Sequence, residues 1–156
     1  MKKRHFWIVV YIILTAFIFI RSSKPASISS AESHGIVIFL EKIIKPFMHA
    51  SPDNLQEMLT VFVRKTAHVV EFTALSGVAC RIICTFGKPL KDFFVWVLFS
   101  GLFTACVDEA IQITSPGRAG LISDVFIDFS GTLLGLCISL IVATLVLGKK
   151  KERRSL

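Results

Sequence analysis

The chain has 156 residues, of which 53% are hydrophobic and 19% are charged, and its mean hydropathy is +0.69. A soluble domain of this length is much less apolar, so the composition excludes an ordinary soluble protein and indicates one whose solvent is lipid. The net charge of +7 comes from short basic runs beside apolar segments, which are typical of juxtamembrane sequence and exclude nucleic acid as a partner.

The first apolar segment, residues 6–20, follows three basic residues and ends at Arg21. A helix needs about 20 residues to cross the hydrocarbon core, so this segment is slightly short, and His5 and Arg21 would extend to the two surfaces. Its basic start also resembles a signal peptide. Because the apolar stretch is long and no clear small-residue cleavage site follows it, we predict a retained transmembrane helix at 1–21, with a cleaved signal peptide as the alternative.

A long connection, residues 22–60, comes next. It begins with the Ser-rich stretch SSKPASISSAESHG, which predicts a flexible linker. The stretch IVIFLEKIIKPFM is too short to cross a membrane and is interrupted by three charges, so we predict an interfacial helix lying on the membrane surface. Ser51 and Pro52 then make a good helix start, with Ser51 as the cap and Pro52 in the first turn.

Four candidate spans are completed by three further apolar segments, residues 61–86, 93–113 and 121–147. We therefore predict an all-α integral membrane protein with four transmembrane helices, located in the cell membrane. If both termini are cytoplasmic, the inner side holds eleven of the 18 basic residues and two of the 11 acidic ones. The positive-inside rule favours this orientation, in which 22–60 is an extracytoplasmic loop, 61–148 a three-helix region and 149–156 a basic cytoplasmic tail.

Each of the last three spans carries polar or small residues at the spacing of one helix face. These stripes are Arg64, His68 and Glu71; Gly101, Ala105, Asp108 and Gln112; and Asp124, Asp128, Gly131 and Gly135. The last two form a GxxxG face, which lets another helix approach closely. Lys65 and Glu109 lie about 100° round their helices from the preceding stripe residue. We expect the three stripes to face one another.

In the predicted orientation, the polar residues of all three spans lie near the outer surface, below Arg118 in the turn TSPGRAG. The first span has no charge between its ends, so we expect it to be peripheral. Charges in lipid are costly, which means that they should pair or line water. The candidate ligand-binding residues are Arg64, Lys65, His68, Glu71, Asp108, Glu109, Gln112, Arg118, Asp124 and Asp128.

This cluster contains five acidic and three basic residues, and His68 can be neutral or charged. A purely structural network of ion pairs tends toward balance. The negative excess of about two therefore requires a neutral carboxyl group, a protonated His68 or a bound cation. A structural role for the network, in which polar contacts only fix helix packing, stays an alternative.

Three runs in this region resemble the VanZ-like family of small bacterial membrane proteins. They are RKTAHVVEF at 64–72, DEAIQITSPGR at 108–118 and DVFIDFSGTLLG at 124–135, and the resemblance extends over about 61–147. The chain departs from the family pattern at three positions, with Phe72 where Tyr is frequent, Ile111 where His is frequent and Asp128 where Asn is frequent. Losing the second histidine weakens any scheme that uses a histidine pair.

The resemblance implies a role at the outer surface of the cell envelope, because the named member of the family is associated with low-level teicoplanin resistance. From the residues, we expect Arg64, Lys65 and Arg118 to meet a phosphate or carboxylate of a membrane lipid or a lipid-linked cell-wall precursor. Two alternatives stay open. One is a structural helix-assembly protein, and the other an intramembrane metal-dependent enzyme acting on a phosphate-bearing lipid.

In the enzyme alternative, His68 or Glu71 is a general base and the carboxylates hold a divalent cation. Oxygen ligands would favour Mg²⁺, Mn²⁺ or Ca²⁺ over zinc. The four cysteines all fall within apolar spans, where a small apolar thiol is the simplest interpretation. We therefore assign no cofactor, no resident metal and no catalytic residue from the sequence.

Overall fold

A computed structural model describes residues 2–47, 52–87 and 93–152 of the chain. The helices are α1 (Lys2–Ser22), α2 (Ala26–Ile44), the short 3-10 helix η1 (Lys45–Phe47), α3 (Pro52–Cys84), α4 (Phe94–Ile113) and α5 (Ile122–Glu152). In this part of the chain there is no strand, and four helices are long and apolar enough to cross a membrane: α1, α3, α4 and α5. The predicted all-α fold with four membrane-length helices is confirmed.

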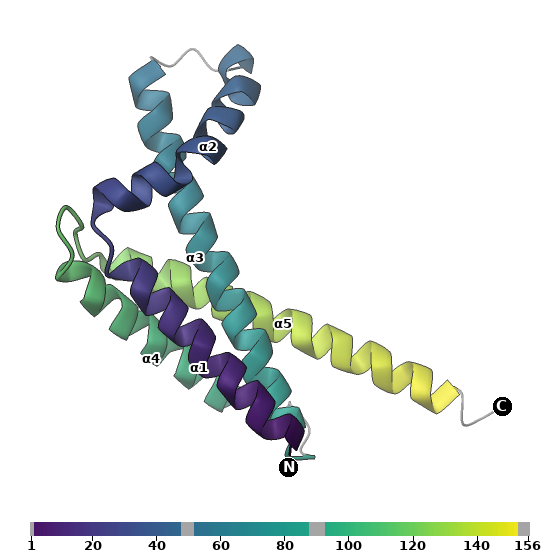
Figure 1. Cartoon of the computed structure of the whole chain (residues 1–156). Helices are drawn as coiled ribbons and strands as arrows, with labels where there is room; N and C mark the ends of the chain where they lie inside the picture. Colours follow the sequence, from purple (N-terminus) through teal and green to yellow (C-terminus); the bar gives the residue numbers. More distant parts are fainter. Residues whose placement is uncertain (1, 48–51, 88–92, 153–156) are drawn as a thin grey trace.

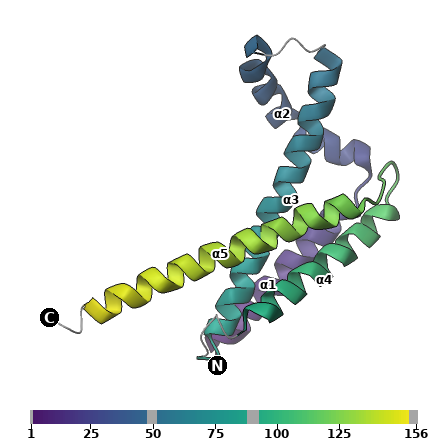
Figure 2. The ribbon, with the colours of Figure 1, turned by 180° about the vertical axis from the view of Figure 1, so that it is seen from behind.

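Helix α3 is the centre of the arrangement. It packs most extensively against α5, and it also contacts α1, α2 and α4. Figures 1 and 2 show α1 on one side of α3 and α5 on the other, while the C-terminal half of α5 diverges from the remaining helices. Polar residues on α3 can therefore face α1 on one side and α4 and α5 on the other.

Two connections meet at the end of the bundle that carries the α4–α5 turn, which we call the turn end. The Ala26 backbone N–H donates to the Pro116 carbonyl oxygen at 3.1 Å, and the Ser115 hydroxyl donates to the Ser22 carbonyl oxygen at 3.0 Å. Gly117 provides the positive φ of +74° that this turn requires. The corner between α1 and α2 is thus fixed against the turn between α4 and α5.

Beyond the turn end, α3 continues away from the bundle and pairs with α2 (Figure 1). A helix of 33 residues is about 50 Å long, which exceeds the hydrocarbon thickness of about 30 Å. Val37 on α2 packs with Leu55 and Leu59 on α3, forming a small apolar core of their own. The predicted cap residue, Ser51, lies outside the described residues, and so does the end of the basic tail.

The prediction of a flexible linker at 22–35 is wrong, because α2 begins at Ala26. Ser29 and Ser33 are buried, and the Ser33 hydroxyl donates to the carbonyl oxygens of Ser29 and Ser30 within the helix. These bonds within the helix satisfy the buried hydroxyl without water. Packing against α3 then stabilises a helix that composition alone does not favour.

The interfacial location of this segment stays a prediction. Within α2, Ile36, Phe39 and Ile43 are exposed although they are apolar. They lie at helical spacing on a face distinct from Val37. An exposed apolar face of this kind is what a helix on a membrane surface needs.

The close approach of α5 to α3 depends on the two predicted glycines. A Cβ atom added at Gly131 would lie 2.5 Å from the Val69 carbonyl oxygen, and one added at Gly135 would collide with the carbonyl oxygen of Thr73. The Thr73 hydroxyl in turn donates to the Gly131 carbonyl oxygen at 3.1 Å. The expected GxxxG contact is present, and its partner is α3.

Candidate functional site

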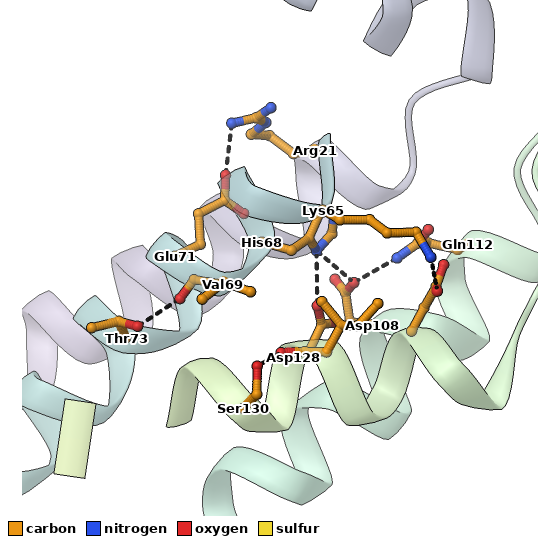
Figure 3. A network of polar contacts seen from close by, with 12 residues as sticks. Arg21, Lys65, His68, Val69, Glu71, Thr73, Asp108, Gln112, Asp128 and Ser130 are labelled. Carbon is orange, nitrogen blue, oxygen red and sulfur yellow. Dashed lines mark hydrogen bonds and ion pairs between the residues drawn. The ribbon is translucent and has the colours of Figure 1, made fainter. Parts of the chain in front are cut away.

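A histidine and two aspartates from three helices meet near the turn end (Figure 3). His68 Nδ1 on α3 lies 3.4 Å from Asp128 Oδ1 on α5 and 3.7 Å from Asp108 Oδ2 on α4. Both carboxylates are buried, whereas 18% of the His68 side chain is exposed. We call this group the His–Asp–Asp triad.

A chain of hydrogen bonds connects the triad to the α4–α5 turn. The Gln112 amide donates to Asp108 Oδ2 at 2.9 Å, and Arg118 Nη1 donates to Gln112 Oε1 at 3.1 Å. Burial lowers the pKa of the Arg118 guanidinium, and the nearby positive charge of Arg64 acts in the same direction. An arginine keeps its charge in proteins, so Arg118 is a half-buried cation held beside the triad.

Three other predicted site residues already have partners. Lys65 Nζ lies 2.7 Å from Asp124 Oδ1, which links α3 to the first turn of α5. Glu109 Oε1 accepts the Leu121 backbone N–H at 2.6 Å, immediately before α5 begins. Glu109 therefore supports the entry into α5, where an N–H group has no partner within the helix.

Glu71 is separated from the triad by its partner. Arg21 on α1 donates to Glu71 Oε1 at 2.6 Å, and Figure 3 shows the Glu71 side chain directed toward Arg21 while His68 points toward α4 and α5. Glu71 and His68, which the sequence places on one face of α3, thus contact different helices: Glu71 contacts α1, and His68 contacts α4 and α5.

Arg21 is the functional-site candidate that the sequence analysis missed. We expected α1 to be peripheral, and it is the least buried of the four membrane-length helices. Even so, Ile18 is buried in a core with Phe72, and Arg21 completes the ion pair with Glu71.

The sequence contained evidence for the location of Arg21, because the depth argument used for the other spans also places this residue at the turn end. With Arg21, the cluster has four basic residues against five acidic ones, so the excess falls to one.

A cavity of about 240 Å³ opens between α3, the α4–α5 turn and the start of α5. Seven of the ten predicted site residues line it: Arg64, Lys65, His68, Gln112, Arg118, Asp124 and Asp128. The other three, Glu71, Asp108 and Glu109, are not among its lining residues. The Arg64 side chain makes no hydrogen bond or ion pair with any residue that the structure describes.

The four membrane-length helices and the polar cluster at one end of their bundle define a small multi-pass α-helical membrane protein. The family comparison agrees with this class, since the model of the VanZ/LLP1 family matches residues 7–143, and the chain belongs to that family. The match begins within α1, whereas the sequence resemblance began at residue 61. Searches of curated proteins and of solved structures give no match.

Proposed function

We propose that the cavity at the turn end binds the anionic headgroup of a membrane amphiphile, such as the phosphate of a lipid-linked cell-wall precursor. The observation that carries this proposal is the position of Arg64, Lys65 and Arg118, which all line one cavity. Three cations around a small opening favour a phosphate or a carboxylate.

The three cations have different roles in this proposal. Lys65 is neutralised by Asp124, and Arg118 is held in place by Gln112. The Arg64 side chain has no such partner in the described part of the chain, so its whole guanidinium can form new bidentate hydrogen bonds with a phosphate. Val61 and Leu121, which also line the cavity, provide apolar surface for the start of an acyl or prenyl chain.

The cell-envelope part of the proposal depends on orientation. The distribution of basic residues favours a turn end outside the cytoplasm, at the surface where glycopeptide antibiotics meet lipid-linked precursors. We propose that binding of such a ligand is how this chain affects susceptibility to teicoplanin-type glycopeptides, the property that its family suggests.

Photo-crosslinking of the purified full-length chain with a lipid-linked precursor tests the proposal. Arg64→Ala and Arg118→Ala should each weaken binding about tenfold or more, since a hydrogen bond to a charged group contributes about 1.5–3 kcal/mol. Arg81→Ala is the matched control, because Arg81 lies near the other end of α3 and does not line this cavity. Labelling that is equal in all three variants and the wild type would contradict the proposal.

Glycopeptide susceptibility of cells that express the same variants provides a second measurement. We expect Arg64→Ala to lose the effect of the wild-type chain at an unchanged protein level. If the effect is lost only when the protein level falls, the cluster is a helix-packing device, as the structural alternative holds.

A further inference from the structure

The His–Asp–Asp triad has a feature that the headgroup proposal does not use. Each aspartate keeps a buried oxygen with no hydrogen-bond partner, Asp108 Oδ1 and Asp128 Oδ2, and His68 Nδ1 has only the two longer contacts at 3.4 Å and 3.7 Å. Leaving such atoms unpaired is costly, and the cost is largest for charged groups. The three side chains come from three different helices and converge, so a cation bound among them would supply the missing partner.

We propose that the triad is a binding site for a divalent transition-metal ion of the zinc type. One ligand atom from each of His68, Asp108 and Asp128 lies within 4.8 Å of the other two. Tetrahedral ligands at zinc distances of about 2.0–2.2 Å are about 3.4 Å apart. The two separations from His68 Nδ1, 3.4 Å and 3.7 Å, are close to that spacing, and none of the three ligand atoms lies more than 4.8 Å from another.

Burial separates this site from a loose acidic cluster. Asp108 is 0% exposed and Asp128 is 2% exposed, so water does not solvate these carboxylates as it does surface acids. The bases nearest to them are directed elsewhere, because Lys65 pairs with Asp124 and Arg118 donates to Gln112. Protonation of His68 alone would leave one of the two negative charges uncompensated, whereas a divalent cation neutralises both.

The ligand types favour a transition-metal ion over Mg²⁺ or Ca²⁺. The two alkaline-earth ions take oxygen ligands, while an imidazole nitrogen combined with carboxylates suits Zn²⁺, Mn²⁺ or Fe²⁺. This revises the ion preference of the enzyme alternative, which considered carboxylates as the only ligands. Gln112 acts as a positioning residue, because its amide fixes the Asp108 carboxylate through a 2.9 Å hydrogen bond.

The site is open toward the cavity. His68 and Asp128 both line the cavity, so a metal between them has coordination positions that face it. Three protein ligands and an open position are the arrangement of catalytic rather than structural zinc sites. A water molecule or an anionic oxygen from the cavity can fill the remaining position.

Metal analysis of the full-length protein tests this inference without any amphiphile, so its failure leaves the headgroup proposal intact. The chain is purified in detergent with a tag that contains no histidine, treated with a chelator, and dialysed against Zn²⁺ or Co²⁺. We expect one Zn²⁺ per chain, and at least tenfold weaker affinity in Asp108→Asn and Asp128→Asn. The control is Glu41→Gln, which removes an acid on α2 that belongs neither to the triad nor to the lining of the cavity, and it should bind like the wild type.

Two further readouts keep the outcome decisive. The visible spectrum of the Co²⁺ form should lack thiolate charge-transfer absorption, since the four free cysteines could otherwise bind the ion. If an aspartate variant does not fold, as judged by helicity and elution behaviour, His68→Gln tests the same site. A wild-type chain that binds no Zn²⁺, binding that survives loss of all three ligands, or a thiolate spectrum would each overturn the inference.

Discussion

Replacement of Gly131 by alanine is expected to lower the free energy of unfolding of the helix bundle by about 1–3 kcal/mol, the usual cost of overpacking. The added Cβ would lie 2.5 Å from the Val69 carbonyl oxygen and 2.9 Å from the Phe72 Cβ. Ordinary contacts between such atoms need about 3.5 Å, so α3 and α5 must separate by roughly 1 Å. The backbone at Val69 cannot relieve this clash by changing rotamer, so the clash is relieved only by moving α3 and α5 apart.

Unfolding by SDS in mixed micelles, followed by circular dichroism, measures this change. Gly135→Ala should behave in the same way, because its added Cβ collides with the Thr73 carbonyl oxygen. Gly77→Ala is the control: it lies within α3, no atom lies within 4 Å of the added Cβ, and alanine favours helix by up to about 1 kcal/mol. If Gly131→Ala and Gly135→Ala unfold like Gly77→Ala, the close contact of α3 with α5 is refuted.

Three further predictions concern the turn end. Arg21→Ala should destabilise the bundle by roughly 2–3 kcal/mol, which is below the value for a fully buried pair because the Arg21 side chain is 32% exposed. Adding Glu71→Gln should restore most of the lost stability, since it removes the unpaired buried charge. Equal stability of the single and double variants would contradict this prediction. Ser115→Ala should cost about 1 kcal/mol in the same SDS assay, since its bond to the Ser22 carbonyl is lost. Ala119→Cys in a chain without native cysteines should react with an impermeant maleimide on intact cells, and labelling only after lysis would reverse the predicted orientation.

Much of the bundle was predictable from periodicity. On α4, Gly101, Ala105, Asp108 and Gln112 recur at helical spacing, and all four are buried. A lipid-facing stripe has no reason to carry small or polar residues, so such a stripe identifies the packed face without knowledge of the partner. The meeting of α3, α4 and α5 at the turn end followed from the same argument applied to each span.

The parts that sequence missed depend on partners distant along the chain. Nothing local shows that Arg21 reaches Glu71, because 50 residues separate them and a terminal arginine is equally suited to a membrane surface. The Ser-rich start of α2 has the composition of a linker, but it is helical and continues into the part of α2 that packs against α3. The periodicity of α3 likewise does not predict that Glu71 faces α1 while His68 faces the triad, because this depends on where the neighbouring helices lie.

The structure also locates the charge imbalance that composition only counted. Arg21 neutralises Glu71, and Lys65 neutralises Asp124, so neither pair contributes a net charge. What remains is positive at the cavity, which both Arg64 and Arg118 line. It is negative at Glu109, which accepts the Leu121 backbone N–H, and at the His–Asp–Asp triad, where two buried carboxylates share one imidazole.

The positive charge at the cavity and the negative charge at the triad favour different ligands. An anionic headgroup would neutralise the positive charge, and a divalent cation would neutralise the negative one. Arg64→Ala removes part of the positive charge at the cavity without changing any triad ligand, and Asp128→Asn removes part of the negative charge at the triad without changing the cationic residues around the cavity. The two proposals therefore fail separately, although an anionic oxygen bound between Arg64 and a metal at the triad would satisfy both charges at once.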